Sequence, residues 1–148
     1  MNTVADLARA VLLHLGGRPV KLRWRRPSTA EYSGQVYATK SGLVCDIDPT
    51  CGDHLLYIVC HEAAHVKLHS HRFPVTRDAD LYPGAIRRGW ESLKRERRTD
   101  PVIRAAEQQA DDLAHHWMAW ADQNCRRYGS PGDQIETRKL YALLDYGK

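Results

Sequence analysis

Residues 61–65 read His-Glu-Ala-Ala-His, which places two imidazoles and a carboxylate at a spacing typical of metal-dependent hydrolysis. On an α-helix, His61 and His65 lie one turn apart on the same face, so both rings can bind one ion. Glu62 follows the first of these ligands and lies within reach of a water molecule on that ion. This is the H-E-x-x-H pattern, in which the histidines bind zinc and the glutamate acts as general base.

The residues around the motif predict a buried helix. An apolar run over 55–60 leads into the motif, and Val66 and Leu68 follow it. Apolar side chains on nearly every face are typical of a helix in the protein interior. A partly dry pocket would also strengthen the pull of the ion on its bound water. The alternative is a buried helix whose histidines only satisfy local hydrogen bonds.

A catalytic zinc site needs a third protein ligand and an open position for water. Glu107 is the first candidate, because apolar residues after Pro101 recur at helical spacing and Asp100 can cap the start of that helix. Asp111 lies one turn after Glu107, where its carboxylate could accept the other ring N–H of a ligand histidine. Alanines such as Ala110 on the same face would let this helix approach the first one closely. The alternative is a pair of carboxylates on a solvated face.

Two further histidines follow the motif. His71 occupies the last ligand position of the longer H-E-x-x-H-x-x-G-x-x-H pattern, but Leu68 replaces the glycine at which the chain turns. His69 lies four residues after His65, and three ligands along one straight helix spread too far to meet, because each turn rises about 5.4 Å. We therefore expect His69 to be a structural or pocket-wall residue, and His71 is the weaker alternative to Glu107.

These two segments resemble the ImmA/IrrE-type metallopeptidases, a compact zincin family of bacteria, phages and mobile elements. The resemblance runs through residues 56–69 and 107–114, and the second block is similar to the family pattern Glu-x-x-Ala-Asn/Asp-x-Phe-Ala. Leu113 replaces the usual phenylalanine, and Ala63-Ala64 replaces a larger residue followed by glycine. The likeness covers about residues 1–125, and the tail past Gly129 has no clear counterpart.

The resemblance implies a zinc ion on His61, His65 and Glu107, with Glu62 as the base. It further implies an endopeptidase that cuts a specific cytoplasmic protein, such as a repressor or other regulator of a phage or mobile element. Two alternatives stay open. One is a binding module that keeps the zincin fold but grips a partner protein or nucleic acid. The other is a DNA-associated protease of the SprT type, which would prefer His71 or another histidine as its third ligand.

The pattern of the whole chain predicts an α+β fold, namely a compact gluzincin-like domain over 1–128 with a C-terminal helical tail over 129–148 packed on it. The small sheet is expected to have three strands in an antiparallel or mixed arrangement. The expected elements are a helix over 4–15, a strand over 20–25, a hairpin of 34–39 and 43–47, the active-site helix from about 52 to 71, a basic helix over 85–98, the long third-ligand helix from 101 to about 128 and a short helix from 133 to about 145.

The strand before the active-site helix is the expected substrate strand. We expect it to form the edge of the sheet, where an extended peptide could add to it as a further strand and place a carbonyl over the metal. The predicted contact residues are Leu43, Val44, Cys45, Asp46 and Ile47. Tyr57, Tyr82 and His69 all stay open as the group that stabilises the oxyanion. The stretch 72–84 is either a lid or a plain connection.

Length and composition favour a single cytoplasmic domain. The chain has 148 residues, no apolar run long enough to cross a membrane, and no secretory leader pattern at its start. Its 22 lysines and arginines exceed 18 acidic residues, and they cluster over 21–26 and 87–98. Such clusters can bind nucleic acid or acidic protein, but solvated faces of mixed charge are the favoured interpretation. Direct nucleic-acid binding is therefore not favoured.

Overall fold

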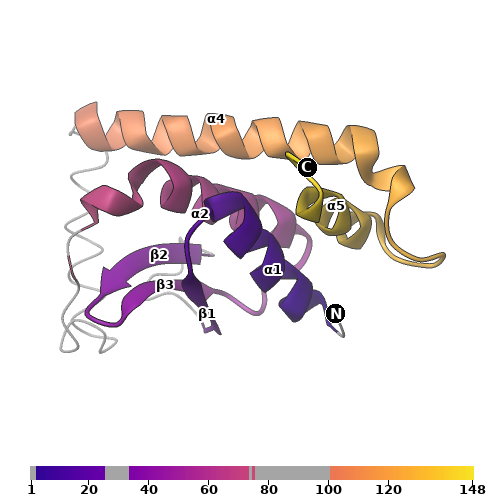
Figure 1. Cartoon of the computed structure of the whole chain (residues 1–148), viewed down its shortest axis with the longest axis horizontal. Helices are drawn as coiled ribbons and strands as arrows, with labels where there is room; N and C mark the ends of the chain where they lie inside the picture. Colours follow the sequence, from indigo (N-terminus) through magenta and orange to yellow (C-terminus); the bar gives the residue numbers. More distant parts are fainter. Residues whose placement is uncertain (1–2, 26–33, 74, 76–100) are drawn as a thin grey trace.

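Four α-helices and a three-stranded sheet make up residues 3–25, 34–73, 75 and 101–148, the part of the chain that the computed structural model describes (Figure 1). The α+β fold class is confirmed for these residues. The elements are α1 (Val4–Gly16), β1 (Val20–Trp24), β2 (Gly34–Thr39), β3 (Gly42–Ile47), α2 (Leu55–His69), α4 (Pro101–Asn124) and α5 (Ile135–Leu144), with short 3₁₀ turns η1 (Gly52–His54), η2 (Ser70–Arg72) and η4 (Cys125–Arg127).

Several predicted features lie outside the described residues. They are the basic helix over 85–98, the basic cluster over 87–98, Tyr82, Asp100 as a helix cap, and nearly all of the stretch 72–84. Within the described ranges, no helix combines the length and the hydropathy that crossing a bilayer requires.

Helix α1 begins and ends at residues suited to capping a helix. The Thr3 hydroxyl accepts a hydrogen bond from the backbone N–H of Asp6 at 3.1 Å, as an N-cap does. Gly17 ends the helix with a φ of 75°, a left-handed conformation that glycine adopts without steric cost. The buried face of α1, which includes Leu7 and Val11, joins the main core.

The sheet is mixed, and its strand order is β1-β3-β2. Strand β3 pairs with β2 in the predicted antiparallel hairpin, and it pairs with β1 in parallel, Val20 opposite Leu43. The prediction that residues 43–47 form the sheet edge is therefore wrong. A central strand has its backbone N–H and C=O groups paired on both sides, so β3 cannot accept a substrate strand. The edge strands of the described sheet are β1 and β2.

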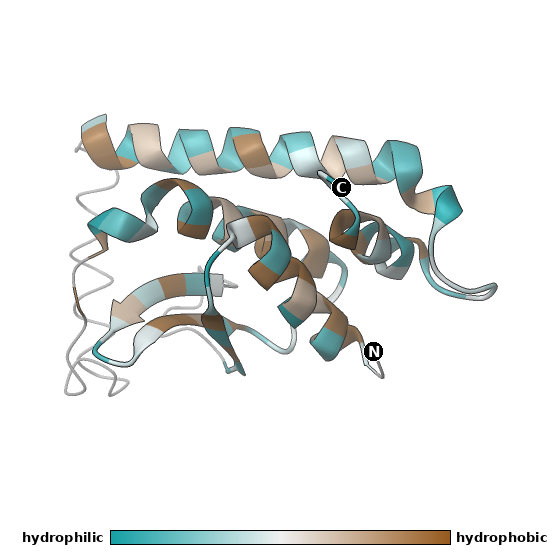
Figure 2. Cartoon of the chain, in the orientation of Figure 1, coloured by the Kyte–Doolittle hydropathy of each residue, from teal (hydrophilic) through white to brown (hydrophobic). Residues whose placement is uncertain are grey.

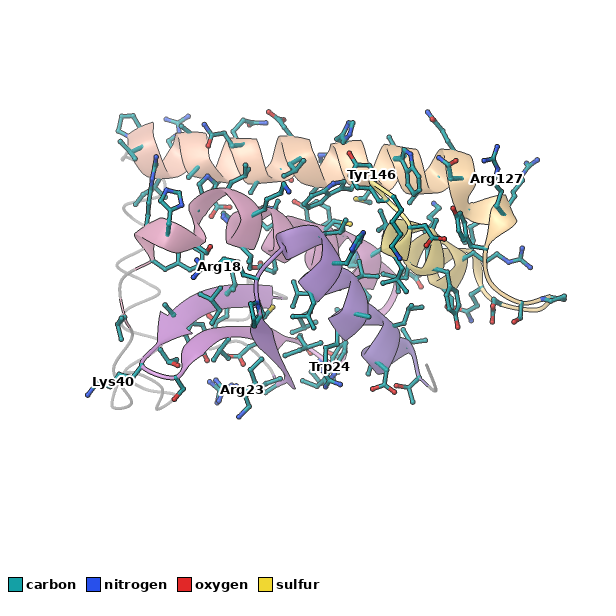
Figure 3. The ribbon with its side chains drawn as sticks, in the orientation of Figure 1. Arg18, Arg23, Trp24, Lys40, Arg127 and Tyr146 are labelled. Carbon is teal, nitrogen blue, oxygen red and sulfur yellow. The ribbon has the colours of Figure 1, made fainter. Side chains whose placement is uncertain are left out.

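Asp46, one of the predicted substrate contacts, is instead the centre of a buried polar network. Its side chain is 0% exposed. It accepts hydrogen bonds from Arg23 Nε at 3.0 Å, Gln35 Nε2 at 3.1 Å and Tyr37 Oη at 2.9 Å, and Arg25 Nε lies 3.1 Å from its second oxygen. Figure 3 shows Arg23 on the side of the sheet away from the helices. Two arginines of the basic cluster over 21–26 thus pair with an acid of this chain.

The other predicted substrate contacts are also structural. The side chains of Cys45 and Ile47 are buried in the main core against the helices, and Leu43 packs against that core. Val44 is buried as well. These side chains pack inside the protein, so they are not available to contact a bound peptide.

We expect Asp46→Ala to lower the free energy of unfolding by roughly 2–3 kcal/mol, somewhat less than the loss of a fully buried ion-pair partner, because both arginines stay partly exposed. Chemical denaturation measures this change. Asp53→Ala, which removes an exposed acid from η1, is the matched control. Equal stability of the two variants would contradict the structural role assigned to Asp46.

Helix α2 lies between the sheet and α4 (Figure 1). It packs on β2 and α1 on one side and along α4 on the other. Figure 2 shows α4 banded by hydrophilic and hydrophobic residues along its length, as expected for a helix with one face in the core. The buried residues of α2 are Leu56, Ile58, Val59, Cys60, Glu62, Ala63, Ala64, Val66 and His69. The H-E-x-x-H motif therefore lies on the most buried of the helices that the structure describes.

The C-terminal segment 129–148 contains α5, which packs against α1 and α4. Leu140 and Leu143 of α5 are buried in the main core. The Tyr146 backbone oxygen lies 2.8 Å from His14 Nε2 of α1, and its hydroxyl lies 3.0 Å from His116 Nε2 of α4. The tail is therefore joined to two helices, α1 and α4.

Candidate metal centre

Two ligand atoms from α2 meet a carboxylate from α4. His61 Nε2 lies 3.3 Å from Glu107 Oε2, and His65 Nε2 lies 3.4 Å from Glu107 Oε1. One ligand atom from each of the three residues lies within 4.8 Å of the others. In the described part of the chain no other group of three or more His, Cys, Asp or Glu side chains converges in this way. The three predicted ligands thus form a group that could hold one metal ion.

Small side chains let the two helices approach. Ala64 lies one turn after His61 on α2, and Ala110 and Ala114 lie on α4; all three are 0% exposed and belong to the same core. Short side chains at a helix contact reduce the distance between the helix axes. This packing brings Glu107 within reach of both imidazoles, as the alanine pattern predicted.

The second ring nitrogen of His61, Nδ1, lies next to Asp111 and Tyr57. His61 Nδ1 is 3.8 Å from Asp111 Oδ1 and 3.5 Å from the Tyr57 hydroxyl, and that hydroxyl donates a hydrogen bond to Asp111. Burial and the hydrogen bond to Asp111 raise the pKa of Tyr57 well above its usual value, so Tyr57 stays a donor. Asp111 lies beside the second ring nitrogen of His61, but at 3.8 Å it is beyond hydrogen-bond distance of that nitrogen. Tyr57 lies on the Nδ1 side of His61, and its spacing four residues before His61 was the available signal.

The second ring nitrogen of His65, Nδ1, has a different neighbour. His65 Nδ1 lies 3.2 Å from His69 Nδ1, and His69 Nε2 lies 3.1 Å from Gln109 Oε1. His69 is only 6% exposed. Gln109 was not predicted from sequence. His71 is exposed in η2 and is not part of the converging group.

Glu62 is 6% exposed and lies on α2 beside the first ligand histidine. Strand β2 approaches α2 closely at this point. A Cβ atom added to Gly34 would lie 2.6 Å from Ile58 Cγ2 and 3.4 Å from Glu62 Cγ. Gly34 therefore lets β2, an edge strand, run directly past the carboxylate that the motif assigns as general base.

A polar pocket of about 390 Å³ adjoins the converging group. Its lining comes from α2 and α4 and includes two of the three candidate ligands together with the Tyr57–Asp111 pair. The lining residues are Tyr57, His61, Arg104, Glu107, Gln108 and Asp111. A pocket beside a metal group gives a small molecule or a peptide side chain access to it.

The charge balance at the site predicts how metal binding depends on pH. Burial lowers the pKa of His61, but the hydrogen bond to Glu107 and the charges of Glu62, Glu107 and Asp111 outweigh this effect, so the pKa is raised. In the metal-free protein, protonated His61 contributes stability that is complete below the unfolded pKa of about 6.5 and is lost as pH rises through the folded pKa. A metal ion needs the neutral imidazole and competes with this proton.

We therefore expect the apparent metal affinity to rise with pH through the pKa of His61 and then to level off. Below that pKa, binding should release about one proton per ion from His61. Calorimetric titrations in buffers of different ionisation enthalpy measure the number of protons released. An affinity that is constant between about pH 6 and about pH 8 would contradict this expectation.

Compared with protein-family models, with curated proteins and with solved structures, the chain matches none of them. The likeness to the ImmA/IrrE-type family therefore rests on the residues of the two segments 56–69 and 107–114. The converging side chains, through their geometry and chemistry, are the basis for inferring an activity.

Proposed function

We propose that this protein is a zinc-dependent endopeptidase with a zincin-type site. The observation that carries the proposal is the convergence of His61, His65 and Glu107 from two packed helices, with the buried Glu62 next to the first of them. Three protein ligands with a vacant fourth position are typical of catalytic zinc, whereas structural zinc sites have four.

The spacing of the ligand atoms supports zinc. Zinc bonds to nitrogen and carboxylate oxygen are about 2.0–2.2 Å long, so two ligand atoms at tetrahedral positions lie about 3.3–3.5 Å apart. Here His61 Nε2 lies 3.3 Å from Glu107 Oε2 and His65 Nε2 lies 3.4 Å from Glu107 Oε1, so each imidazole lies at about this spacing from one oxygen of the same carboxylate. The donor set of two imidazoles and one carboxylate also suits zinc better than magnesium or calcium, which prefer oxygen ligands.

The chemistry assigns a separate task to each residue. A zinc ion held by His61, His65 and Glu107 supplies the Lewis acidity that polarises a peptide carbonyl and activates water. Glu62 accepts a proton from the attacking water on its carboxylate and then delivers this proton to the nitrogen of the leaving amine. The Tyr57–Asp111 pair, beside Nδ1 of His61, orients that imidazole.

Strand β2 is the proposed docking strand for the substrate, in place of β3. It is an edge strand, and Gly34 brings it against the helix turn that carries Glu62. Among the residues that the structure describes, its outer side pairs only at Ala38, which forms an isolated bridge with Val75. An extended peptide could pair with β2 between Gly34 and Tyr37 and place its scissile carbonyl near Glu62.

The substrate class follows from the family resemblance, which implies a regulator such as a phage- or element-type repressor in the cytoplasm. A binding module without proteolysis is the alternative. The buried Glu62 favours the peptidase, because a site that only grips a partner has no use for a general base next to its metal.

The test is cleavage of a complex peptide mixture. Zinc-loaded protein is incubated with a peptide library, and new termini are identified by mass spectrometry. We expect a restricted set of new termini that disappears when a chelator removes the metal and reappears when zinc is restored. Loaded protein that produces no new termini while capturing an intact partner would overturn the peptidase and favour the binding module.

A further inference from the structure

His65 is one end of a hydrogen-bond chain that crosses from α2 to α4. His65 Nδ1 lies 3.2 Å from His69 Nδ1, and His69 Nε2 lies 3.1 Å from Gln109 Oε1. The middle member, His69, is 6% exposed and has both ring nitrogens occupied by these contacts. The chain ends two residues after Glu107, on the helix that supplies the third ligand.

The orientation of the Gln109 side-chain amide sets the direction of this chain. In the structure the amide oxygen, which can only accept, faces His69 Nε2, so His69 carries its proton on that nitrogen. A neutral His69 with a proton on Nε2 has a lone pair on Nδ1 and can only accept there. His65 must then donate from Nδ1, which leaves the lone pair of His65 on Nε2. That is the atom that lies 3.4 Å from Glu107.

We propose that His69 and Gln109 are positioning residues that hold His65 in the tautomer with its Nε2 free for the metal. This inference rests on the proposed metal site. Gln109 acts through His69 and neither contacts the ion. The chain also joins α2 to α4, so the acceptor that selects the tautomer comes from the helix that carries Glu107.

The two ligand histidines differ in the groups that lie near their Nδ1 atoms. His61 has a carboxylate and a phenol near its Nδ1, and a carboxylate can only accept. His65 has a second imidazole near its Nδ1, which can accept or donate, and among the described residues Gln109 contacts the other nitrogen of that imidazole. The metal-binding tautomer of His65 is therefore more sensitive to a distant substitution than that of His61.

Gln109 is exposed, so its substitution should leave the fold intact. We expect Gln109→Ala to weaken zinc binding by at least ~3-fold and His69→Phe by about 10–100-fold, the usual range for a residue that orients a metal ligand. Gln109→Glu keeps an acceptor and should bind zinc as the unmodified protein does. Gln123→Ala, an exposed glutamine on the same helix far from the site, is the control. Competition with a chromogenic chelator measures each affinity.

A second readout does not depend on metal. Long-range ¹H–¹⁵N correlation spectra of metal-free protein carrying Glu107→Ala, which removes the carboxylate that could accept from His65 Nε2, report which nitrogen of His65 is protonated. We expect Nδ1 in this background alone and with Gln109→Glu, and a mixture of tautomers with Gln109→Ala. A Gln109→Ala affinity equal to that of Gln123→Ala, or an Nε2-protonated His65 in the Glu107→Ala background, would overturn the inference. If the unmodified protein binds no zinc, the proposed function itself fails, which is a distinct result.

Discussion

Glu62→Gln is expected to reduce peptide hydrolysis by about 10²–10⁴-fold, the usual contribution of a general base. Glutamine has nearly the same shape and can occupy the same buried space, but its amide cannot take a proton from water. Glu62 does not belong to the converging ligand group, so the affinity for zinc should change little. Initial rates on a peptide found in the library experiment, measured with a known zinc content, give the ratio.

The control for this variant is Glu136→Gln, which makes the same chemical change on α5 away from the metal group. It should keep the rate and the zinc content of the unmodified protein. If Glu62→Gln retained a rate within a few-fold of the control, the base would be another residue. A Glu62→Gln protein that loses its zinc together with its activity would instead show that Glu62 acts mainly by holding the site together.

Glu107→Ala is expected to lower the affinity for zinc by more than about 100-fold, beyond the effect of removing a residue that only orients a ligand. The loss should also appear in stability, because a ligand that binds only the folded state stabilises it. At a free zinc concentration of about 100 Kd the unmodified protein gains about 2.7 kcal/mol, and a 100-fold weaker variant gains about 0.4 kcal/mol. Thermal unfolding with and without zinc measures the stabilisation in the unmodified protein and in Glu107→Ala.

His71→Ala is the matched comparison, since His71 was the sequence alternative for the third ligand and lies exposed in η2. It should keep both the zinc affinity and the zinc-dependent rise in melting temperature. The opposite pattern, with zinc lost from His71→Ala and kept by Glu107→Ala, would favour the alternative site with a histidine as its third ligand.

The convergence of His61, His65 and Glu107 could be predicted because helical periodicity determines which side chains share a face. The i, i+4 spacing of His61 and His65 needs no knowledge of the rest of the fold. The alanines near Glu107 indicated which face of the second helix packs closely. The contacts of Tyr57 with Asp111 and of His69 with Gln109 could not be predicted in the same way, because they depend on how far α2 and α4 are shifted along each other.

The strand order could not be predicted from local pattern. The hairpin between β2 and β3 is visible in the sequence, because a short turn joins them. The parallel pairing of β1 with β3 is a crossover between strands about twenty residues apart, and no local feature reports it. Burial of Asp46 follows from the same crossover, which places two arginines of the β1 segment beside it.

Anomalous X-ray scattering at the zinc edge, from crystals of zinc-loaded protein, is the sharpest test of the proposed metal centre. We expect one strong peak, bonded to His61 Nε2, His65 Nε2 and a carboxylate oxygen of Glu107 at about 2.0–2.2 Å. A peak on other side chains, or a fully loaded crystal in which the Glu107 carboxylate lies away from the ion, would contradict the proposed centre.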